Sequence, residues 1–456
     1  MLVPAQVLRR VDRQSCPIRC KNPVESAANV GRFAGLAHHE AGKRIASSRF
    51  CPQTATVGGA TWCPVTSRHA RNNKLQGDPN TLTATFSETA VIFGGPSPEH
   101  DVSILTGLQA ARALMDSPGA SQAIHPIYWT KSGDWFEVKP DSEAASFIDG
   151  LPRNAKPLEL VVGGGGFRTK ASGLAKRRPL EITTVVNCCH GGPGEDGSLQ
   201  ATLDLAKIRY TGPTVASAAI CMDKISSAAI IAAENIPALP RRLLTTTSCD
   251  PGFPGPYILK PRFGGSSIGI DVVADLATAV ARLSTNPHLR NGAVIEPYRP
   301  DLYDLQIGVR SWPELQLSTI ERPLRTRAGS EILGYADKYV GDEGMVSAPR
   351  ELPAKIPDEV AQRIRDAAKQ VATAMSIRGI ARIDFLSDGD QVLLNEVNTI
   401  PGSLARHLWT EPEIGFKDLL TDMIDEASAR PAASFTTVGA DGSVLRGAGA
   451  IASKLA

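Results

Sequence analysis

The sequence predicts a mixed fold, with an α/β domain followed by α+β structure, and three observations lead to this. From about residue 89 to residue 234, short apolar runs alternate with helical patterns, which favours an α/β domain with a largely parallel sheet. Between 244 and 312, closely spaced strand signals surround a glycine-serine turn, which indicates a small α+β subdomain. From 358 to 427, two helical patterns flank two strand signals, which indicates a larger α+β unit.

The α/β domain is expected to begin with a buried strand at residues 90–93, because Ala-Val-Ile-Phe is continuously apolar and Gly-Gly-Pro-Ser follows it. The four glycines at 163–166 predict a flexible loop rather than a phosphate site, because no lysine, Ser/Thr pair or following helix accompanies them. The other elements follow the same two patterns. Strands are expected at 124–129, 158–162 and 182–187, and helices at 102–115, 199–207 and 224–234.

The two α+β units are expected to hold a helix with Asp275 as its N-cap and a hairpin closed by Asp388-Gly389. Their strands are expected at 257–260, 268–273, 293–296, 305–312, 379–386 and 391–398, and their helices at 275–283, 358–375 and 414–427. The domain organisation then reads 1–86 basic extension, 87–213 N-terminal α/β domain, 214–300 central subdomain, 301–430 C-terminal α+β domain and 431–456 flexible tail.

The first 86 residues are rich in arginine and lysine, poor in acids and weakly periodic. Such a segment buries too little apolar surface to offset its chain entropy. Three interpretations compete: a disordered basic tail, a targeting peptide and an artefact of the chosen translation start. The apolar spacing is too irregular for the amphipathic helix of a transit peptide, so we favour the first or the third.

Composition excludes several other classes of protein. The net charge of +2 makes no case for a nucleic-acid or membrane partner, and no apolar run approaches the roughly 18 residues of a membrane span. Cys188 and Cys189 lie in an apolar run and are expected to be small buried hydrophobes in a reducing cytoplasm. The spacing of Cys16, Cys20, Cys51 and Cys63 fits no tight zinc template.

The first motif with chemical content is Lys260-Pro-Arg-Phe-Gly-Gly-Ser266-Ser267-Ile-Gly, in which a lysine ends a strand before a flexible turn. Glycines let backbone N–H groups approach an anion, hydroxyl groups add donors, and the lysine supplies a positive charge. The motif suggests a phosphate-binding loop. The alternative is a plain β-hairpin with a long turn.

The second motif is the pair of strands that carries Arg382, Asp384, Glu396 and Asn398. Because residues i and i+2 share a face of a strand, the two acids, the asparagine and the arginine are expected to point the same way. Such oxygen ligands suit Mg²⁺, which takes few protein ligands and completes its shell with water and phosphate. The alternative is a solvated hairpin face.

The third and fourth motifs are loops between a strand and a helix, at the edge of a sheet where α/β proteins bind ligands. One is His190-Gly-Gly-Pro-Gly-Glu-Asp-Gly197. The other is Gly94-Gly-Pro-Ser-Pro-Glu99-His-Asp-Val-Ser103, whose Glu99 has the charge to bind a cationic group. Each is also compatible with an ordinary βα turn.

In their order along the chain and in their residues, the four motifs resemble those of the D-alanine–D-alanine ligases of the ATP-grasp superfamily. The resemblance runs from about Ala90 to Ala429, some three quarters of the chain. Smaller signatures in the right order are Tyr210-Thr-Gly, Met222-Asp-Lys, Ala336-Asp-Lys-Tyr339 and Asn398-Thr-Ile-Pro-Gly402.

This resemblance implies the ATP-grasp fold, with an N-terminal parallel-sheet α/β domain, a small central α+β subdomain and a C-terminal α+β catalytic domain. It implies that ATP phosphorylates one D-alanine and that a second attacks the acyl phosphate, giving D-alanyl-D-alanine, ADP and phosphate for peptidoglycan precursor synthesis. It further implies two Mg²⁺ (or Mn²⁺) ions, a cytoplasmic homodimer, and no nucleic-acid or membrane partner.

The same resemblance assigns roles to single residues. Glu99 would bind the ammonium group of the first D-alanine, and His190 would lie in the substrate pocket. Ser266 and Tyr339 would form hydrogen bonds with Glu99 that orient a mobile loop and help accept the amine proton. It makes Arg382 and the Gly402 backbone the groups that stabilise the tetrahedral intermediate. The ATP-binding residues are Lys224, Lys260, Ser266, Ser267, Glu296, Asp304 and Lys338, and the metal ligands are Asp384, Glu396 and Asn398.

Two departures from the family pattern leave the acceptor open. The ribose-binding glutamate is replaced by Asp304, and the segment after Gly402 carries the bulky Arg406 and His407 where small or hydroxylated residues are usual. Tyr339, where phenylalanine would indicate D-lactate, favours an amine acceptor. A related ligase for another amino or hydroxy acid, and a catalytically silent nucleotide-binding regulator, are the competing hypotheses. The intact Lys260, Arg382 and metal ligands count against the silent regulator.

Overall fold

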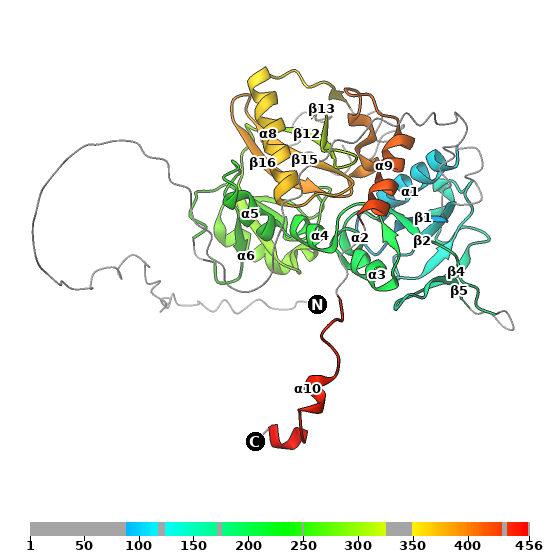
Figure 1. Ribbon diagram of the computed structural model, residues 1–456. Coiled ribbons are helices and arrows are strands. Elements are labelled where there is room, and N and C mark those ends of the chain that lie inside the picture. The colour runs from blue at the N-terminus through cyan, green and yellow to red at the C-terminus, as the bar shows by residue number, and fades with distance from the viewer. Residues whose placement is uncertain are drawn as a thin grey trace, which may run out of the picture. The chain divides into compact units, whose positions relative to one another are not determined.

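The computed structural model (Figure 1) describes residues 88–116, 124–170, 176–248, 250–324, 349–430 and 436–454. All of them fall in one compact unit, Thr81–Ala456. The predictions for residues 1–86, including its cysteines, and for Lys338 and Tyr339 therefore lie outside the described residues. Within the described ranges, no helix is both long and apolar enough to cross a membrane.

The first sheet has seven strands in the order β5-β4-β3-β2-β1-β6-β7. Strands β2, β1, β6 and β7 are parallel, while β3, β4 and β5 are antiparallel. The prediction of a largely parallel sheet was therefore wrong for one half. The reason lies in the connections: five residues join β2 to β3 and four join β4 to β5, whereas a parallel crossover needs about a dozen. The strands are β1 (Thr89–Gly94), β2 (Ile124–Trp129), β3 (Trp135–Glu137), β4 (Lys156–Val161), β5 (Gly166–Thr169), β6 (Thr184–Asn187) and β7 (Arg209–Tyr210).

Helices in this part of the chain agree closely with the sequence prediction. They are α1 (His100–Met115), the short α2 (Gly192–Glu195), α3 (Ser198–Ala206), α4 (Val215–Met222) and α5 (Lys224–Ala233), of which α2 and α4 were not predicted. Cys188 and Cys189 are buried and free, as expected. Gly163, Gly164 and Gly165 belong to the tight turn between β4 and β5, and Gly166 is the first residue of β5.

The second sheet is a four-stranded antiparallel sheet in the order β10-β9-β11-β8. Its strands are β8 (Arg242–Leu244), β9 (Tyr257–Pro261), β10 (Asp271–Val273) and β11 (Ala293–Pro297), and its apolar residues form a core with α6 (Leu276–Thr285). Asp275 caps α6 by accepting a hydrogen bond from the Thr278 N–H at 2.8 Å, as predicted. Strand β10 begins three residues later than expected, because residues before it form the turn of the glycine-serine motif.

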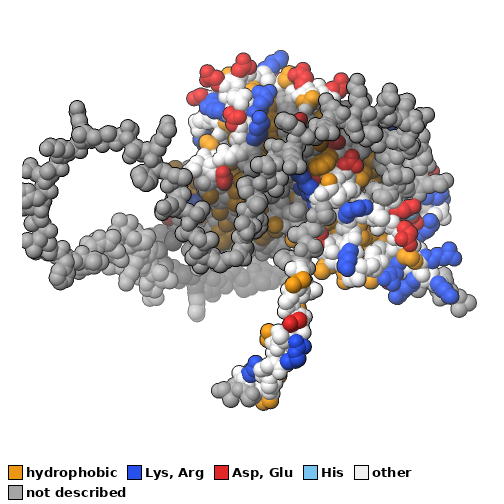
Figure 2. Space-filling model, viewed as in Figure 1, with side chains coloured by type: hydrophobic (Ala, Val, Ile, Leu, Met, Phe, Trp, Pro, Cys, Tyr) orange, Lys and Arg blue, Asp and Glu red, His pale blue; other side chains and the backbone are white. Residues whose placement is uncertain are grey.

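The third sheet has the order β14-β13-β12-β15-β16, and all of its pairings are antiparallel. Its strands are β12 (Tyr303–Arg310), β13 (Gln316–Pro323), β14 (Arg350–Glu351), β15 (Ile380–Ser387) and β16 (Val392–Asn398). The apolar stripe of α8 (Asp358–Ala374), which includes Val360, Ile364 and Val371, packs into the core of this sheet. Figure 2 shows acidic and basic side chains mixed over the outer side of α8. Because Ala381, Ile383 and Phe385 of β15 belong to this core, the residues between them, Arg382 and Asp384, lie on the other face of the sheet.

After β16, the chain packs back against the first sheet. The helix α9 (Phe416–Ala429) and the 3-10 segment Gly402–Leu408 share one apolar core with β1 and α1, through residues such as Leu404, Leu420 and Phe93. The Arg378 guanidinium reinforces this junction, because it donates hydrogen bonds to the carbonyl groups of Tyr210 and Gly212. The first and third sheets are thus held together on either side of the loop that follows Asn398. In the tail, the short α10 (Ser443–Arg446) has no buried residue.

A charged triad at the start of the first sheet gives a prediction for stability. His125 Nδ1 lies 2.9 Å from Glu137 Oε1, and its Nε2 lies 2.6 Å from Glu88 Oε2. The hydrogen bond to Glu137, aided by the one to Glu88, raises the pKa of His125 despite its burial. This stabilisation is complete below the unfolded pKa of about 6.5 and is lost as the pH rises through the raised folded pKa.

The substitution His125→Asn is therefore expected to lower the thermal midpoint more at pH 5.5 than at pH 9. The expected loss at the lower pH is on the order of 1 kcal/mol, because the triad is partly exposed. Thermal unfolding of both proteins across this range tests the prediction. A difference that does not change with pH would contradict it.

Candidate active site

The hairpin of β15 and β16 carries the second motif in the predicted arrangement. Arg382 pairs with Asn398, and Asp384 pairs with Glu396, so the four polar residues occupy two adjacent rows on one face. The second row continues across the sheet, since Asp384 also pairs with Gln306 and Gln306 pairs with Glu321. A β-bulge leaves Asn395 as the extra residue between Glu396 and Leu394. The hairpin prediction is confirmed, while the bulge was not foreseen.

Arg382 and Asp384 form a bidentate ion pair on this face. Arg382 Nε donates to Asp384 Oδ1 at 2.7 Å, and Nη2 donates to Oδ2 at 2.8 Å. Asn398 Nδ2 also donates to Asp384 Oδ2, at 3.1 Å. The candidate metal ligands therefore meet at one corner of the sheet, with Arg382 as the neighbouring cation.

The chemistry of this donor set fits Mg²⁺. Two carboxylates and an amide supply hard oxygen atoms, and Mg²⁺ commonly uses only one or two protein carboxylates together with phosphate and water. In the described ranges, no group of three or more His, Cys, Asp or Glu residues is arranged to hold a metal ion. A closed protein cage is thus absent from that part of the chain, whereas the open set Asp384, Glu396 and Asn398 leaves room for phosphate oxygens.

A first cavity lies between the second and third sheets and collects most of the residues predicted to bind ATP. It is lined on one side by Lys224, Lys260, Ser267 and Glu296, and on the other by Asp304 of β12 and residues of β15 and β16. Apolar side chains, Leu239, Ile258, Ile270, Leu302 and Leu386, complete its walls. A cavity with apolar walls and lysines at one end is suited to a planar base with an attached polyphosphate.

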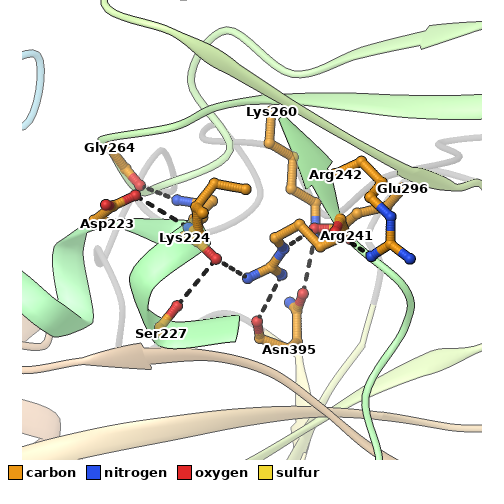
Figure 3. A network of polar contacts seen from close by, with 10 residues as sticks. Asp223, Lys224, Ser227, Arg241, Arg242, Lys260, Gly264, Glu296 and Asn395 are labelled. Atoms are coloured by element: carbon orange, nitrogen blue, oxygen red, sulfur yellow. Dashed lines mark hydrogen bonds and ion pairs between the residues drawn. The ribbon is translucent and has the colours of Figure 1, made fainter. Parts of the chain in front are cut away.

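Figure 3 shows a charged network that includes Lys224, Lys260, Glu296 and Asn395 of the cavity lining. Lys260 Nζ donates to Glu296 Oε2 at 2.8 Å and to Asn395 Oδ1 at 3.0 Å, while Arg241 Nε donates to Glu296 Oε1 at 2.5 Å. Burial by itself would raise the pKa of Glu296, but the charges of Lys260 and Arg241 outweigh it and hold that pKa at about 2. Glu296 is therefore ionised at neutral pH. Sequence reasoning missed Arg241, because an arginine just before a strand carries no distinctive signal.

Lys224 connects the cavity to the glycine-serine loop. It is the first residue of α5, and its buried Nζ donates to the carbonyl of Gly264 at 2.5 Å. Burial lowers its pKa. The preceding residue, Asp223, caps α5 and pairs with Arg262, whose Nε and Nη2 donate to it at 2.7 and 2.6 Å. The loop is thus fixed to the start of α5 at two points.

A second, smaller cavity adjoins the first, and its lining brings together all four residues predicted to bind the substrate, Glu99, His190, Arg382 and Gly402, with Ser266, which was predicted to be catalytic. Ser266 Oγ donates a hydrogen bond to Glu99 Oε1. Ser266 and Ser267 have positive φ angles of 52° and 59°, a conformation that the neighbouring glycines help the turn to reach. The glycine-serine loop therefore separates the two cavities and contributes to both.

The protonation state of His190 follows from its two partners. Nδ1 lies 2.6 Å from the carbonyl oxygen of Ile400, which only accepts, so Nδ1 carries the proton. Nε2 therefore accepts from Thr106 Oγ1, at 2.7 Å, and Thr106 Oγ1 in turn accepts from the Ser403 N–H at 3.0 Å. Burial lowers the pKa of His190 to about 4, so the imidazole is neutral at pH 7.

Glu195 is a second residue whose role the sequence did not reveal, although its motif was noted. Its carboxylate accepts hydrogen bonds from the N–H groups of Gly191 and Ile400, both at 2.9 Å, and from Thr399 Oγ1 at 3.2 Å. Burial and the charge of Glu99 raise its pKa to about 7, against the effect of these donors. Glu195 thus fixes the loop after Asn398 to the loop that follows β6.

The segment after Gly402 has an unusual backbone. Ser403, Leu404 and Ala405 all have positive φ angles, between 46° and 51°, which is costly for residues other than glycine. Buried packing of Leu404 and Ala405 holds this left-handed turn in place. Beyond it, His407 Nε2 lies 3.0 Å from Glu321 Oε2, and Arg350 Nη1 lies 3.2 Å from Glu321 Oε1. The structure thus directs His407 toward the polar face of the third sheet.

Comparison with known proteins identifies the family. The model for the N-terminus of the D-ala D-ala ligases matches residues 88–213, and the model for their C-terminus matches residues 240–425. A D-alanine–D-alanine ligase of Mycolicibacterium smegmatis is 31% identical over 376 residues, which cover 75% of this chain and 96% of that protein. Another from Thermosipho melanesiensis is 27% identical over 346 residues, which cover 74% of this chain and 92% of that protein.

Solved structures agree on the fold. A D-alanine–D-alanine ligase from Helicobacter pylori superposes with a TM-score of 0.58 at 23% identity, over 76% of this chain and all of that one. The VanG D-Ala:D-Ser ligase from Enterococcus faecalis gives 0.60 at 24% identity, over 75% of this chain and 99% of that one. With the two sequence models, these similarities show that the chain belongs to the D-alanine–D-alanine ligase family of ATP-dependent ligases, which have the ATP-grasp fold.

Proposed function

We propose that the chain joins two D-alanine molecules through an acyl phosphate, with ATP as phosphoryl donor. The observation that carries the proposal is that the two cavities share a wall. Lys224, Gly264, Gly265 and Glu396 line both of them, so a nucleotide in the first would direct its terminal phosphate toward a small carboxylate in the second. In-line positioning and neutralisation of charge are the main requirements of phosphoryl transfer.

In the first proposed step, an oxygen of the D-alanine carboxylate attacks the γ-phosphorus, and ADP leaves. Glu99 holds the substrate's ammonium group through opposite charge. Lys260 and Lys224 neutralise phosphate charge. Bound Mg²⁺ ions on Asp384, Glu396 and Asn398 would add further neutralisation of the phosphates.

In the second proposed step, the amine of the other D-alanine, as its free base, attacks the carbonyl carbon of the acyl phosphate. Negative charge develops on the carbonyl oxygen, and Arg382 and the Gly402 N–H stabilise it. The C–O bond to phosphate then breaks and phosphate leaves, and the nitrogen passes its proton to Ser266 Oγ, whose own proton is hydrogen-bonded to Glu99. Neutral His190 keeps Thr106 and the Ser403 backbone in place beside Gly402 without adding a positive charge near Arg382. The product serves peptidoglycan precursor synthesis.

Incubation of the purified protein with ATP, Mg²⁺ and D-alanine tests this function. We expect phosphate release and a product with the mass of the dipeptide, and none with L-alanine. Phosphate release only with a different pair of substrates would replace this proposal with a related ligase. Nucleotide binding without any turnover would favour a silent regulator.

One observation favours a second candidate, a ligase with a different acceptor. His407 is bulky and bonded to Glu321, whose pKa is lowered by His407, Arg350 and Arg382 in spite of its burial. Arg382 is electrostatically coupled to Glu321 as well as to His190, which supports a role for His407 near the acceptor.

His407→Ser is therefore expected to change the KM for the acceptor by roughly tenfold, with the KM for ATP within about threefold of wild type, because one pocket contact is typically worth 1–3 kcal/mol. Phosphate release measured with D-alanine, D-serine and D-lactate gives the preference of each protein. Exposed Arg406, whose guanidinium lies over the Phe416 ring, provides the matched control as Arg406→Ser. Equal changes in both KM values would argue against an acceptor role for His407.

A further inference from the structure

We propose that Arg241 is a positioning residue that holds the metal-bearing strand β16 in register with the nucleotide cavity. The inference rests on the function proposed above, and it concerns a residue that touches neither proposed substrate. Arg241 is buried, with 6% of its side chain exposed, and its guanidinium bonds to three separate elements. Nε donates to Glu296 on β11, Nη1 to the Lys224 carbonyl on α5, and Nη2 to the Asn395 carbonyl on β16, at 2.5, 3.3 and 3.0 Å.

Strand β16 needs such support because it is the edge of its sheet. Backbone groups on an edge lack partners within the sheet. The segment that leads to β8 covers part of this edge: the Pro237 carbonyl accepts from the Leu394 N–H at 2.8 Å, and Ala238 forms a parallel bridge with Leu394. Arg241 extends this contact with the edge of β16 by one residue, since its guanidinium donates to the carbonyl of Asn395.

The Asn395 carbonyl that Arg241 binds belongs to the bulged residue of β16. In a regular strand, side chains alternate between the faces, so Asn395 and Glu396 would point to opposite sides. The bulge lets both line the first cavity, where Asn395 accepts from Lys260 and Glu396 belongs to the proposed metal set. If the guanidinium of Arg241 holds this bulge, Arg241 also sets the direction in which the side chains of Asn395 and Glu396 point.

Arg241 has a second effect, on Lys260. Each oxygen of Glu296 has one cationic partner, Arg241 for Oε1 and Lys260 for Oε2. When a nucleotide draws Lys260 toward its phosphates, Arg241 keeps Glu296 paired with a cation. Without Arg241, Glu296 would retain Lys260 as its remaining cation, because a buried carboxylate without a partner is very unfavourable. The nucleotide would then compete with Glu296 for Lys260.

Two substitutions separate these effects. Arg241→Met removes both the charge and the donors, whereas Arg241→Lys keeps a charge for Glu296 but lacks the planar fork that reaches three partners. Arg242→Met is the matched control, since Arg242 is exposed and its Nη1 donates to the Arg241 carbonyl. Thermal unfolding of every variant shows whether it folds.

The readouts are ATP binding by calorimetry in Mg²⁺ without D-alanine, and Mn²⁺ binding by electron paramagnetic resonance with a non-hydrolysable ATP analogue. We expect Arg241→Met to weaken both by roughly tenfold, the equivalent of one lost charge-assisted contact. Arg241→Lys should restore ATP binding to within about threefold of wild type but leave Mn²⁺ binding weak, since it restores the charge alone.

Two results would overturn the proposal. In the first, Arg241→Met resembles Arg242→Met in both titrations. In the second, Arg241→Lys restores Mn²⁺ binding fully, which would make Arg241 a charge partner of Glu296 and no support for β16. Neither titration requires turnover, so wild-type phosphate release with D-alanine tests the proposed function separately.

Discussion

Replacement of Arg382 by alanine is expected to lower kcat by about a thousandfold while ATP affinity stays within about threefold of wild type. The reason is its place in the structure. Arg382 lines the second cavity beside Gly402, where the oxyanion would form, and it is not among the residues that line the first cavity. A cation that acts only on developing charge should affect the chemical step and not the binding of nucleotide.

Calorimetry with ATP and Mg²⁺, together with steady-state kinetics, measures the two quantities for Arg382→Ala. Because Arg382 also pairs with Asp384, Arg382→Lys is a useful control that keeps the charge but loses the bidentate geometry. We expect it to recover part of kcat. A loss of ATP affinity that matches the loss of kcat would show that Arg382 serves the nucleotide instead.

The second large effect is expected at Glu99. Glu99→Gln should lower kcat/KM for D-alanine by roughly a hundredfold, because the substrate's ammonium group loses a charge-assisted contact worth about 1.5–3 kcal/mol. The change is nearly isosteric, so the backbone of the loop between β1 and α1 should be retained. Initial rates over a range of D-alanine concentrations, at saturating ATP, give the value.

Ser266→Ala is the matched control for this prediction, since it removes the hydrogen bond to Glu99 and leaves the carboxylate charge. A decrease of no more than about tenfold is expected, as for one hydrogen bond. If Ser266→Ala were as severe as Glu99→Gln, the geometry of the glycine-serine loop would matter more than the charge of Glu99.

Local patterns predicted those parts of the molecule that depend on local interactions. The hairpin of β15 and β16 follows from alternation of apolar and polar residues around Asp388-Gly389, so its polar face was correctly anticipated. The helices α1, α5 and α8 follow from their helical patterns of apolar residues, and the start of α6 follows from its cap, Asp275. The roles of individual residues came from resemblance to a family, because alternation alone fits a solvated hairpin equally well.

What the sequence did not reveal depends on contacts between distant residues. The bulge at Asn395 interrupts the alternation by one residue, and its partner Arg241 lies 154 positions away. Glu195 reaches the backbone of Ile400, 205 positions away. The antiparallel half of the first sheet was missed because β3 has only three residues and β5 four, too few for a period to be recognised.

The central claim is that a carboxylate oxygen of the first D-alanine becomes bonded to the γ-phosphorus of ATP. The most direct test uses D-alanine labelled with ¹⁸O in its carboxylate, together with ATP and Mg²⁺, and measures the mass of the phosphate that is released. The acyl-phosphate route predicts that each phosphate formed with dipeptide carries one ¹⁸O atom. Unlabelled phosphate in a reaction that makes dipeptide would contradict it.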